Sequence, residues 1–273
     1  MNKPLPVKHQ FTTKEAKMEN RIDLPIAVID SGVGGISVLK ELIKIMPNEK
    51  FLYLGDSKNA PYGTKSRAEV LEITRNNLEM LRARGIKALV IACNTATSAA
   101  VKILREENPD LIIVGIEPAV KPASKLCETP RVLVMATPLT LKEEKFKNLV
   151  NRFAADGEFI PLPCPGLADL IERGDVEGDE VRAYLTDLFS PYLGEKIDGI
   201  VLGCTHYPHV RSVIEEIWDG KVAILDGGEG TARETLRRLA KSELLRDGEG
   251  EVEILNSSNE VKMIEISKKL LYR

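Results

Sequence analysis

From Leu24 onward, short continuous apolar runs alternate with longer stretches in which apolar residues recur at helical spacing. Short apolar runs are typical of strands buried on both faces of a parallel sheet, and the longer pattern is typical of amphipathic helices. Strands alternating with helices indicate βαβ units, so the sequence predicts an α/β fold with mostly parallel sheets. The predicted strands are 24–30, 51–55, 88–93, 112–116, 131–136, 159–162, 199–202, 223–225 and 252–255. The predicted helices are 36–45, 66–84, 97–107, 140–153, 167–173, 179–193, 209–218, one from 231 onward and a closing helix.

Two of the predicted strands lead into a cysteine that is followed at once by small polar residues. Cys93 precedes Asn94, and Cys204 precedes Thr205. Ligand sites in open α/β sheets lie at the carboxyl ends of strands. Matched cysteines in the two halves of the chain therefore predict one site with a thiol on each side.

A cysteine can also be a small buried hydrophobe, and this is our interpretation of Cys127 and Cys164, which lack the strand-end context. For Cys93 and Cys204 the context favours reactivity. The dipole of a following helix lowers the pKa of a thiol at its N-terminus, so we expect both thiols to ionise readily.

The composition excludes several classes of partner. The chain has 273 residues, and its net charge of −3 comes from 38 basic and 41 acidic side chains without a basic stripe. Nucleic acid and anionic membrane surfaces are therefore not expected partners. No apolar run approaches the roughly 18 residues of a transmembrane helix.

The first 23 residues are polar and lack the apolar segment of a signal peptide. This composition predicts a disordered N-terminal extension, 1–23, and the lack of a signal peptide predicts a cytoplasmic protein. Cysteines stay reduced in the cytoplasm, so the four cysteines are expected to be free thiols.

A glycine-rich turn, 30–35, follows the first predicted strand. Its backbone N–H groups could cradle an anion, or its glycines could be there for steric reasons alone. It lacks the glycine spacing of a dinucleotide fingerprint and the lysine of a phosphate loop. Asp30, at the end of the strand, could act as a base or cap the following helix.

His206 and His209 follow Cys204 closely and raise the question of a zinc site. Their spacing is not that of a zinc finger, and no second ligand pair follows, so no metal is expected. His206 fits better as an acid–base partner of the thiol, and His209 as a helix-start or surface residue. Glu172, taken alone, is an ordinary helix carboxylate.

Five motifs follow one another along the chain: Asp30-Ser31-Gly32, Pro61-Tyr62-Gly63, Cys93-Asn94-Thr95, Glu117-Pro118 and Cys204-Thr205-His206-Tyr207-Pro208. Taken together, they resemble those of the glutamate racemases, which are cofactor-independent enzymes of the aspartate/glutamate racemase superfamily. The resemblance runs in order from about 26 to 231. Glutamate rather than aspartate is favoured because the aspartate branch usually carries Glu at the position of His206.

The resemblance implies two similar doubly wound α/β domains that face each other across a cleft. The first would comprise 24–118 plus 226–273, and the second 119–225, with the boundary near two prolines at 118 and 122. It also implies glutamate as the small-molecule substrate, no cofactor, and D-glutamate as a product for peptidoglycan synthesis. Members of the family are often homodimers.

The resemblance further implies a role for each site residue. Cys93 and Cys204 would be the catalytic thiols, with Asp30 assisting the first and His206 and Glu172 the second. Substrate contacts would come from Asp30, Ser31, Tyr62, Gly63, Asn94, Thr95, Thr137, Thr140, Thr205 and His206.

Racemisation explains why two thiols are needed. One group removes the α-proton from one face and another returns a proton to the opposite face, so one thiol must start ionised and the other protonated. A thiol pKa near ~8.5 makes both forms accessible. No lysine lies in a recognisable pyridoxal-phosphate setting.

The sequence departs from the family pattern at 226–228, 141–146 and 121–122, which affects the expected substrate side-chain pocket. Three alternatives remain open. They are a racemase for aspartate or another amino acid, a carbon–carbon lyase with one catalytic cysteine, and a non-catalytic binding module. Retention of both cysteines argues against the last two.

Overall fold

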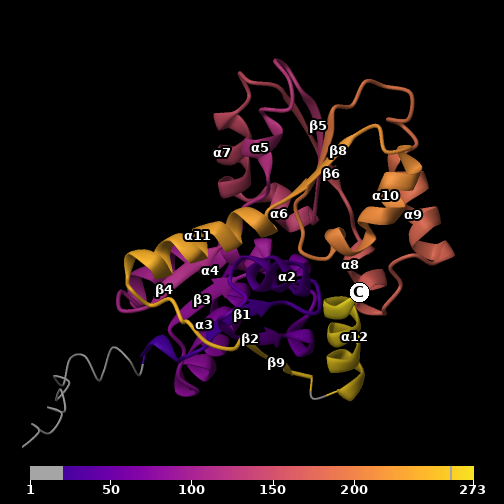
Figure 1. Ribbon diagram of the computed structural model, residues 1–273. Coiled ribbons are helices and arrows are strands. Elements are labelled where there is room, and N and C mark those ends of the chain that lie inside the picture. Colours follow the sequence, from indigo (N-terminus) through magenta and orange to yellow (C-terminus); the bar gives the residue numbers. More distant parts are fainter. Residues whose placement is uncertain (1–20, 259) are drawn as a thin grey trace, which may run out of the picture.

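Two parallel sheets form the framework of the protein, as shown by a computed structural model that describes residues 21–258 and 260–273 (Figure 1). The first sheet has the order β4-β3-β1-β2-β9 and the second β6-β5-β7-β8. The predicted α/β class with parallel strands is confirmed. The strands are β1 (Ile26–Asp30), β2 (Lys50–Gly55), β3 (Ala88–Ile91), β4 (Ile112–Gly115), β5 (Arg131–Ala136), β6 (Glu158–Pro163), β7 (Gly199–Leu202), β8 (Ala223–Asp226) and β9 (Glu251–Asn256).

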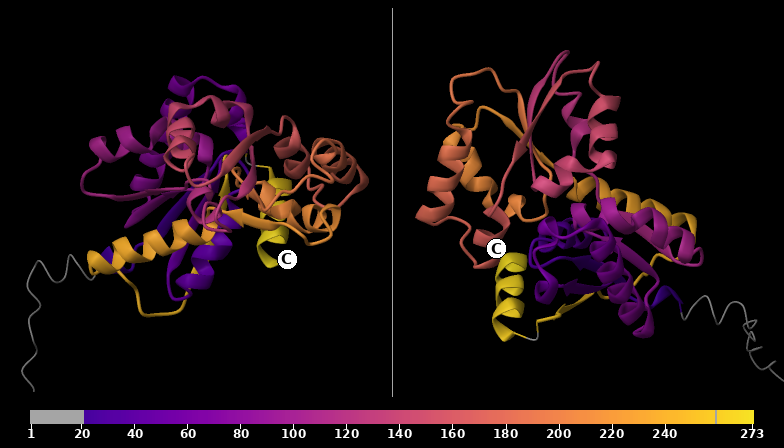
Figure 2. Two further views of the ribbon diagram at one scale, coloured as in Figure 1. Left: turned by 90° about the horizontal axis from the view of Figure 1, so that it is seen from above. Right: turned by 180° about the vertical axis from the view of Figure 1, so that it is seen from behind.

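Helices lie along both sheets, as the further views show (Figure 2). The α-helices are α2 (Ile36–Ile45), α3 (Arg67–Ala83), α4 (Asn94–Glu107), α5 (Val120–Ala123), α6 (Pro138–Lys142), α7 (Glu144–Arg152), α8 (Leu167–Glu172), α9 (Asp179–Phe189), α10 (Arg211–Ile217), α11 (Gly228–Lys241) and α12 (Val261–Tyr272). Three short 3₁₀ turns are η1 (Ser57–Asn59), η2 (Tyr62–Thr64) and η3 (Tyr207–Val210). None of the helices in the described part of the chain is long and apolar enough to cross a membrane.

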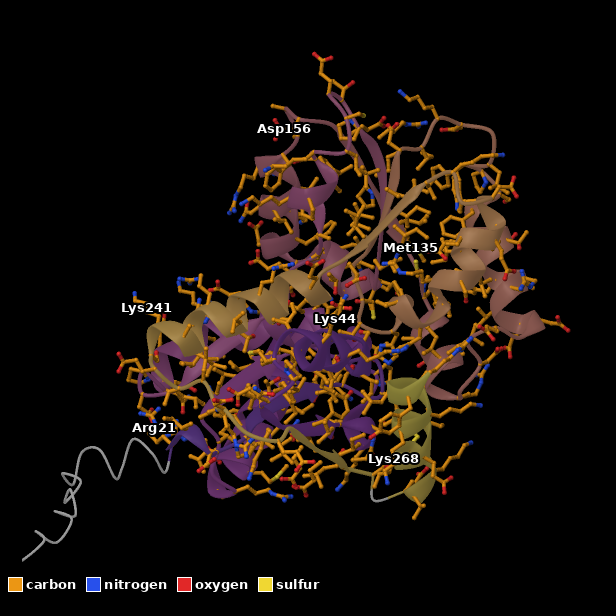
Figure 3. The ribbon with its side chains drawn as sticks, in the orientation of Figure 1. Arg21, Lys44, Met135, Asp156, Lys241 and Lys268 are labelled. Atoms are coloured by element: carbon orange, nitrogen blue, oxygen red, sulfur yellow. The ribbon has the colours of Figure 1, made fainter. Side chains whose placement is uncertain are left out.

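The inner strands β1, β3, β5 and β7 are buried on both faces, which explains their continuous apolar runs. In β1, Ile26 and Val28 join one apolar core, and Ala27 and Ile29 join the core on the opposite face. In β5, a strand of the second sheet, Met135 is fully buried (Figure 3). Successive side chains of a strand point to opposite faces, so a run buried on both sides must be apolar throughout.

The chain passes from the first sheet to the second after β4 and returns after β8. On its return it forms α11, which packs on α2, and then β9, which pairs with β2. The end of the chain therefore completes the first sheet. The domain boundaries at 118/119 and 225/226 stay a prediction.

Five predicted helices differ from those observed. The helix predicted over 179–193 ends at Phe189, and the helix predicted from 231 begins at Gly228. The other three differ as follows. The helix predicted over 140–153 is two helices, α6 and α7, which meet at Glu143 in an extended conformation. The helix predicted from 209 is preceded by η3, which contains Pro208, a residue without a backbone N–H donor. The helix predicted from 97 begins earlier, at Asn94, because Cys93 serves as an unusual N-cap.

Most of the predicted N-terminal extension, 1–20, lies outside the described residues. Its last residues belong to the fold. Ile22 packs against the apolar core of the first sheet, and Asp23 forms an ion pair with Arg246. The prediction of disorder is therefore wrong for these two residues.

Candidate active site

Both predicted cysteines line one cavity of about 200 Å³, although they come from different sheets. Cys93 lies two residues beyond β3 and Cys204 two residues beyond β7. Nearly all the predicted site residues line the same cavity. In addition to the two thiols, these are Ser31, Tyr62, Gly63, Asn94, Thr95, Thr137, Thr140, Glu172, Thr205 and His206.

A chain of close contacts connects Cys204 to the opposite sheet. The Nδ1 atom of His206 lies 3.5 Å from the Cys204 sulfur, and its Nε2 lies 2.6 Å from a carboxylate oxygen of Glu172. The same oxygen of Glu172 accepts a 2.7 Å hydrogen bond from the backbone N–H of Val33. The Val33 N–H, in the glycine turn that follows β1, thus holds the Glu172 carboxylate next to the His206 imidazole, which lies next to the Cys204 thiol.

The electrostatics of this chain favour a charged imidazole. Burial opposes a charge on His206, but its contacts with Cys204 and Glu172 outweigh burial and raise its pKa well above the ordinary value. Burial also works against a charge on Glu172, yet His206 and the Val33 N–H hold the pKa of this carboxyl below its usual value. An imidazolium can donate from both nitrogens, one toward sulfur and one toward the carboxylate.

Cys93 has a different environment, and the expected ease of ionisation is wrong for it. Its sulfur accepts the Ala96 N–H at 3.5 Å, as expected at a helix N-terminus. Burial nevertheless raises the pKa of this thiol to about 12, and the nearby Asp30 carboxylate adds to the rise. The desolvation of a buried thiolate outweighs the helix N-terminus here, so the surroundings of Cys93 favour its protonated form.

Asp30 lies behind the cavity wall and is only 2% exposed. Its carboxylate accepts the Gly32 N–H at 3.1 Å and the Thr205 hydroxyl at 3.0 Å. Burial raises the pKa of this carboxyl. Asp30 does not cap the following helix, since Gly35 is the N-cap of α2. Thr205 follows Cys204 in the sequence, so this bond joins the surroundings of the two thiols.

Two glycines of the turn are required by the close approach of residues that belong to the second sheet's part of the chain. A side chain at Gly32 would overlap the Glu172 carboxylate, and one at Gly34 would lie 2.5 Å from Nδ1 of His206. The two interpretations of the turn, anion binding and steric need, are therefore both correct in part. The turn does bind an anion through the Val33 N–H, but that anion is the protein's own Glu172.

Hydroxyl and amide groups form another wall of the cavity. The hydroxyl of Thr140 lies 3.2 Å from that of Thr95 and 3.0 Å from that of Thr137. Thr95 follows a strand of the first sheet and the other two follow a strand of the second, so this cluster connects the two sheets. The side-chain oxygen of Asn94 is buried and has no hydrogen-bond partner among the described residues. A buried, unpaired acceptor at a cavity wall is available to a ligand that can donate.

Two features of the site, one behind the cavity wall and one in it, were not predicted from the sequence. The fully buried Asp56 accepts hydrogen bonds from Asn59, Asn77, Ser257 and, at 2.6 Å, the hydroxyl of Tyr62. It therefore anchors the loop that carries Tyr62 into the cavity wall. Asp56 follows β2 directly, and Asp30 is the last residue of β1, so a carboxylate at the carboxyl end of a strand was the available signal.

The second feature is Cys164, which we interpreted as a buried hydrophobe. It is buried and packs in an apolar core as expected, yet it also lines the cavity. Its thiol donates to the carbonyl of Leu162, and burial raises its pKa above the usual value. No sequence pattern around Cys164 indicated this position.

His209 does not line the thiol cavity. Its Nε2 lies 3.1 Å from the carbonyl oxygen of Gly34, and burial lowers its pKa to about 4, so the ring is neutral at physiological pH. In the described residues, no group of three His, Cys, Asp or Glu side chains is placed to hold a metal ion.

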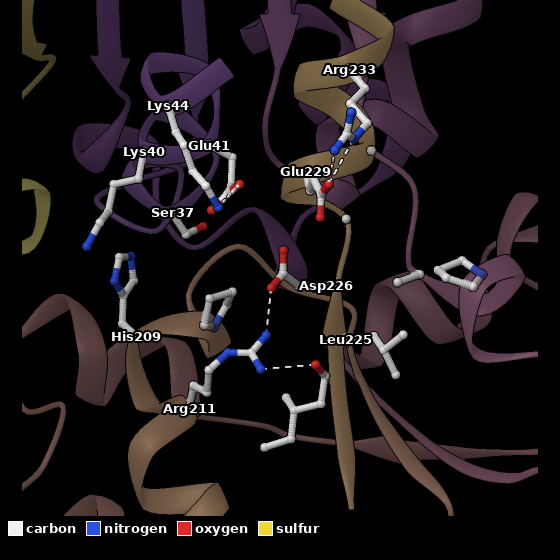
Figure 4. Close-up of a pocket in the computed structure, with 16 residues that line it drawn as sticks. Ser37, Lys40, Glu41, Lys44, His209, Arg211, Leu225, Asp226, Glu229 and Arg233 are labelled. Atoms are coloured by element: carbon white, nitrogen blue, oxygen red, sulfur yellow. Dashed lines mark hydrogen bonds and ion pairs between the residues drawn. The ribbon is translucent and has the colours of Figure 1, made fainter. Parts of the chain in front are cut away.

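A larger cavity of about 740 Å³ shares no lining residue with the thiol cavity (Figure 4). Its lining includes three cations that each pair with a neighbouring carboxylate. Lys44 pairs with Glu41, Arg211 with Asp226 and Arg233 with Glu229. None of the predicted site residues lies in it.

Comparisons with known proteins agree with the motifs. The Asp/Glu/Hydantoin racemase family matches residues 26–235. A glutamate racemase from Clostridium perfringens is 51% identical over 249 residues, which are 90% of this chain and 96% of that protein.

Solved structures are similar over a comparable length. A glutamate racemase from Francisella tularensis in complex with D-glutamate has a TM-score of 0.79 and 28% identity, covering 92% of this chain and 95% of that one. A glutamate racemase isoform from Bacillus anthracis has a TM-score of 0.82 and 29% identity, covering 92% and 94%. These findings confirm the resemblance drawn from the motifs. Because the family match and the curated relative both span most of the sequence, this chain belongs to the Asp/Glu/Hydantoin racemase family.

Proposed function

We propose that the protein interconverts L- and D-glutamate without a cofactor, using Cys93 and Cys204 as the two proton-transferring groups. As a racemase it is an isomerase. The observation that carries the proposal is the single cavity lined by both thiols, one from each sheet. Glutamate as the substrate is supported by the relatives, which are named glutamate racemases, one of them with D-glutamate bound.

In the proposed reaction from L-glutamate, Cys204 acts as a thiolate and removes the α-proton. The imidazolium of His206, 3.5 Å from the sulfur, is the charged partner that a thiolate requires. Cys93 then delivers its thiol proton to the opposite face of the α-carbon. The raised pKa of Cys93 supports this assignment, because the thiol is protonated when the reaction starts.

After one turnover Cys204 is a thiol and Cys93 a thiolate, which is the starting state for D-glutamate. The pairing of Cys204 with the L-isomer and Cys93 with the D-isomer follows the family pattern. The negative charge that develops on the substrate would be stabilised by Ser31, Asn94 and Thr95, which line the cavity. Fixed donors in a site that excludes water contribute strongly to such stabilisation.

We also propose that the product D-glutamate supplies peptidoglycan synthesis. This proposal rests on the resemblance to the glutamate racemases. Under this proposal, the protein supplies the substrate of an enzyme that attaches D-glutamate to a cell-wall precursor.

The substrate assignment predicts that purified protein free of pyridoxal phosphate racemises L-glutamate. Circular dichroism of L-glutamate, with L-aspartate and L-alanine as controls, measures this directly. We expect the glutamate signal to decay to zero and the two control signals to change at least about 100-fold more slowly, because a missing or shortened polar group leaves buried partners unpaired. Faster racemisation of aspartate would contradict the assignment.

A further inference from the structure

Tyr53 is a fully buried residue of β2 that does not line the thiol cavity. Its hydroxyl donates a 2.6 Å hydrogen bond to the carbonyl oxygen of Gly32. Tyr53 therefore holds the glycine turn from the side of the first sheet's core.

The carbonyl of Gly32 and the N–H of Val33 belong to one peptide group. Tyr53 binds its oxygen end, and Glu172 of α8 accepts from its N–H end at 2.7 Å. A donor at the oxygen polarises a peptide group and strengthens its N–H as a donor, an effect that is larger in a low-dielectric interior. One rigid, planar unit thus transmits the position of Tyr53 to Glu172.

From Glu172 the chain of contacts continues to the reacting sulfur. The carboxylate lies 2.6 Å from Nε2 of His206, whose Nδ1 lies 3.5 Å from the sulfur of Cys204. The N–H of Gly32 donates to Asp30, which lies near Cys93, but this N–H belongs to the preceding peptide group. Among the described residues, no hydrogen bond joins Asp30 to the sulfur of Cys93, which accepts from Ala96. The expected influence is therefore on one thiol.

We propose that Tyr53 is a positioning residue for the Cys204 half of the reaction, acting through the Gly32–Val33 peptide group on Glu172 and His206. The inference rests on the proposed racemase function. The hydroxyl keeps its proton for this role, because burial, and then the charges of Asp30 and Glu172, raise the pKa of Tyr53 well above its ordinary value.

Tyr53→Phe tests the proposal, because it keeps the ring in the core and removes only the hydroxyl. We expect kcat for glutamate to fall about tenfold with KM changed by less than about threefold, as for the loss of one supporting hydrogen bond. With β-chloroglutamate, chloride elimination from the enantiomer processed by Cys204 should slow about tenfold. Elimination from the other enantiomer should stay within about threefold of the wild-type rate.

Thr235→Val is the matched control. Thr235 is also fully buried, and its hydroxyl donates to the carbonyl of Thr231 on α11, away from the thiols. Both substitutions remove one buried hydroxyl, so both should lower the melting temperature, but only Tyr53→Phe should change the ratio of the two elimination rates. An unchanged ratio in Tyr53→Phe would show a merely structural role and overturn the proposal.

The amide of Val33 gives a readout that does not depend on activity. In the wild-type protein, NMR should show this amide exchanging at least about 100-fold more slowly than an unstructured amide, and Tyr53→Phe should speed its exchange and shift its proton resonance upfield. An unprotected wild-type amide would overturn the proposal even if the variant failed to fold. A wild-type protein with a protected Val33 amide but no racemase activity would instead contradict the proposed function alone.

Discussion

Replacement of either cavity thiol by serine is expected to reduce glutamate racemisation by at least about a thousandfold. Cys93→Ser and Cys204→Ser each leave a hydroxyl that cannot ionise near neutral pH, so one face of the α-carbon loses its proton-transfer group. Initial rates from L- and D-glutamate measure the loss. Cys127→Ser is the control, because Cys127 is an exposed free thiol outside the cavity and its replacement should leave the rate unchanged.

The same variants should divide the two faces between the thiols. β-Chloroglutamate needs only one proton transfer, because after the α-proton is removed the electron pair forms a Cα–Cβ double bond and chloride leaves. Cys93→Ser should therefore eliminate chloride from the L-enantiomer and Cys204→Ser from the D-enantiomer. If both variants processed the same enantiomer, or either racemised glutamate at the wild-type rate, the two-thiol account would be wrong.

Asp30→Asn and His206→Asn are each expected to slow turnover by roughly 100- to 10,000-fold, the usual range for a lost acid–base partner. Asp30 supports the surroundings of Cys93, and His206 contacts the sulfur of Cys204 directly. Their losses should therefore affect different proton transfers.

The difference between the two reaction directions should appear in kcat and KM but not in kcat/KM. The enantiomers of glutamate have equal free energies, so kcat/KM must stay equal in the two directions, whereas kcat and KM can each differ. We expect Asp30→Asn and His206→Asn to change the kcat ratio of the two directions in opposite senses. His209→Asn is the control and should lower kcat by less than about fivefold, since His209 faces Gly34 and not a thiol. Near-normal kcat in both Asp30→Asn and His206→Asn would show that neither residue supports a thiol.

The strands and the two cysteines could be predicted because their signals are local. A strand buried on both faces must be a continuous apolar run, and its carboxyl end is where a site residue stands. The start of α4 was placed too late because cysteine is not a usual N-cap. The break between α6 and α7 was missed because nothing in the helical pattern of 140–153 marks Glu143 as extended.

The parts of the site that the pattern of residues alone does not indicate depend on contacts between distant segments. Glu172 is an ordinary helix residue until α8 approaches Val33, which is 139 positions away in the sequence. The pKa of Cys93 was expected to fall because the following helix is visible in the sequence, while the burial that raises it is a property of the packed fold. In the sequence, Tyr53 is one residue of a predicted apolar strand, and only the structure shows that its hydroxyl donates to Gly32 of the glycine turn.

The most direct test of the two-thiol account is the fate of the α-hydrogen in heavy water. Wild-type enzyme is given L-glutamate in D₂O, and both enantiomers are separated at low conversion and analysed for deuterium by mass spectrometry. A thiol carries a single hydrogen, so Cys204 should keep the removed proton while Cys93 donates a solvent-derived deuteron. We predict that the D-glutamate formed carries deuterium at the α-carbon and that the remaining L-glutamate is nearly unlabelled. D-Glutamate that retained the original hydrogen would contradict the account, because it would show one group serving both faces.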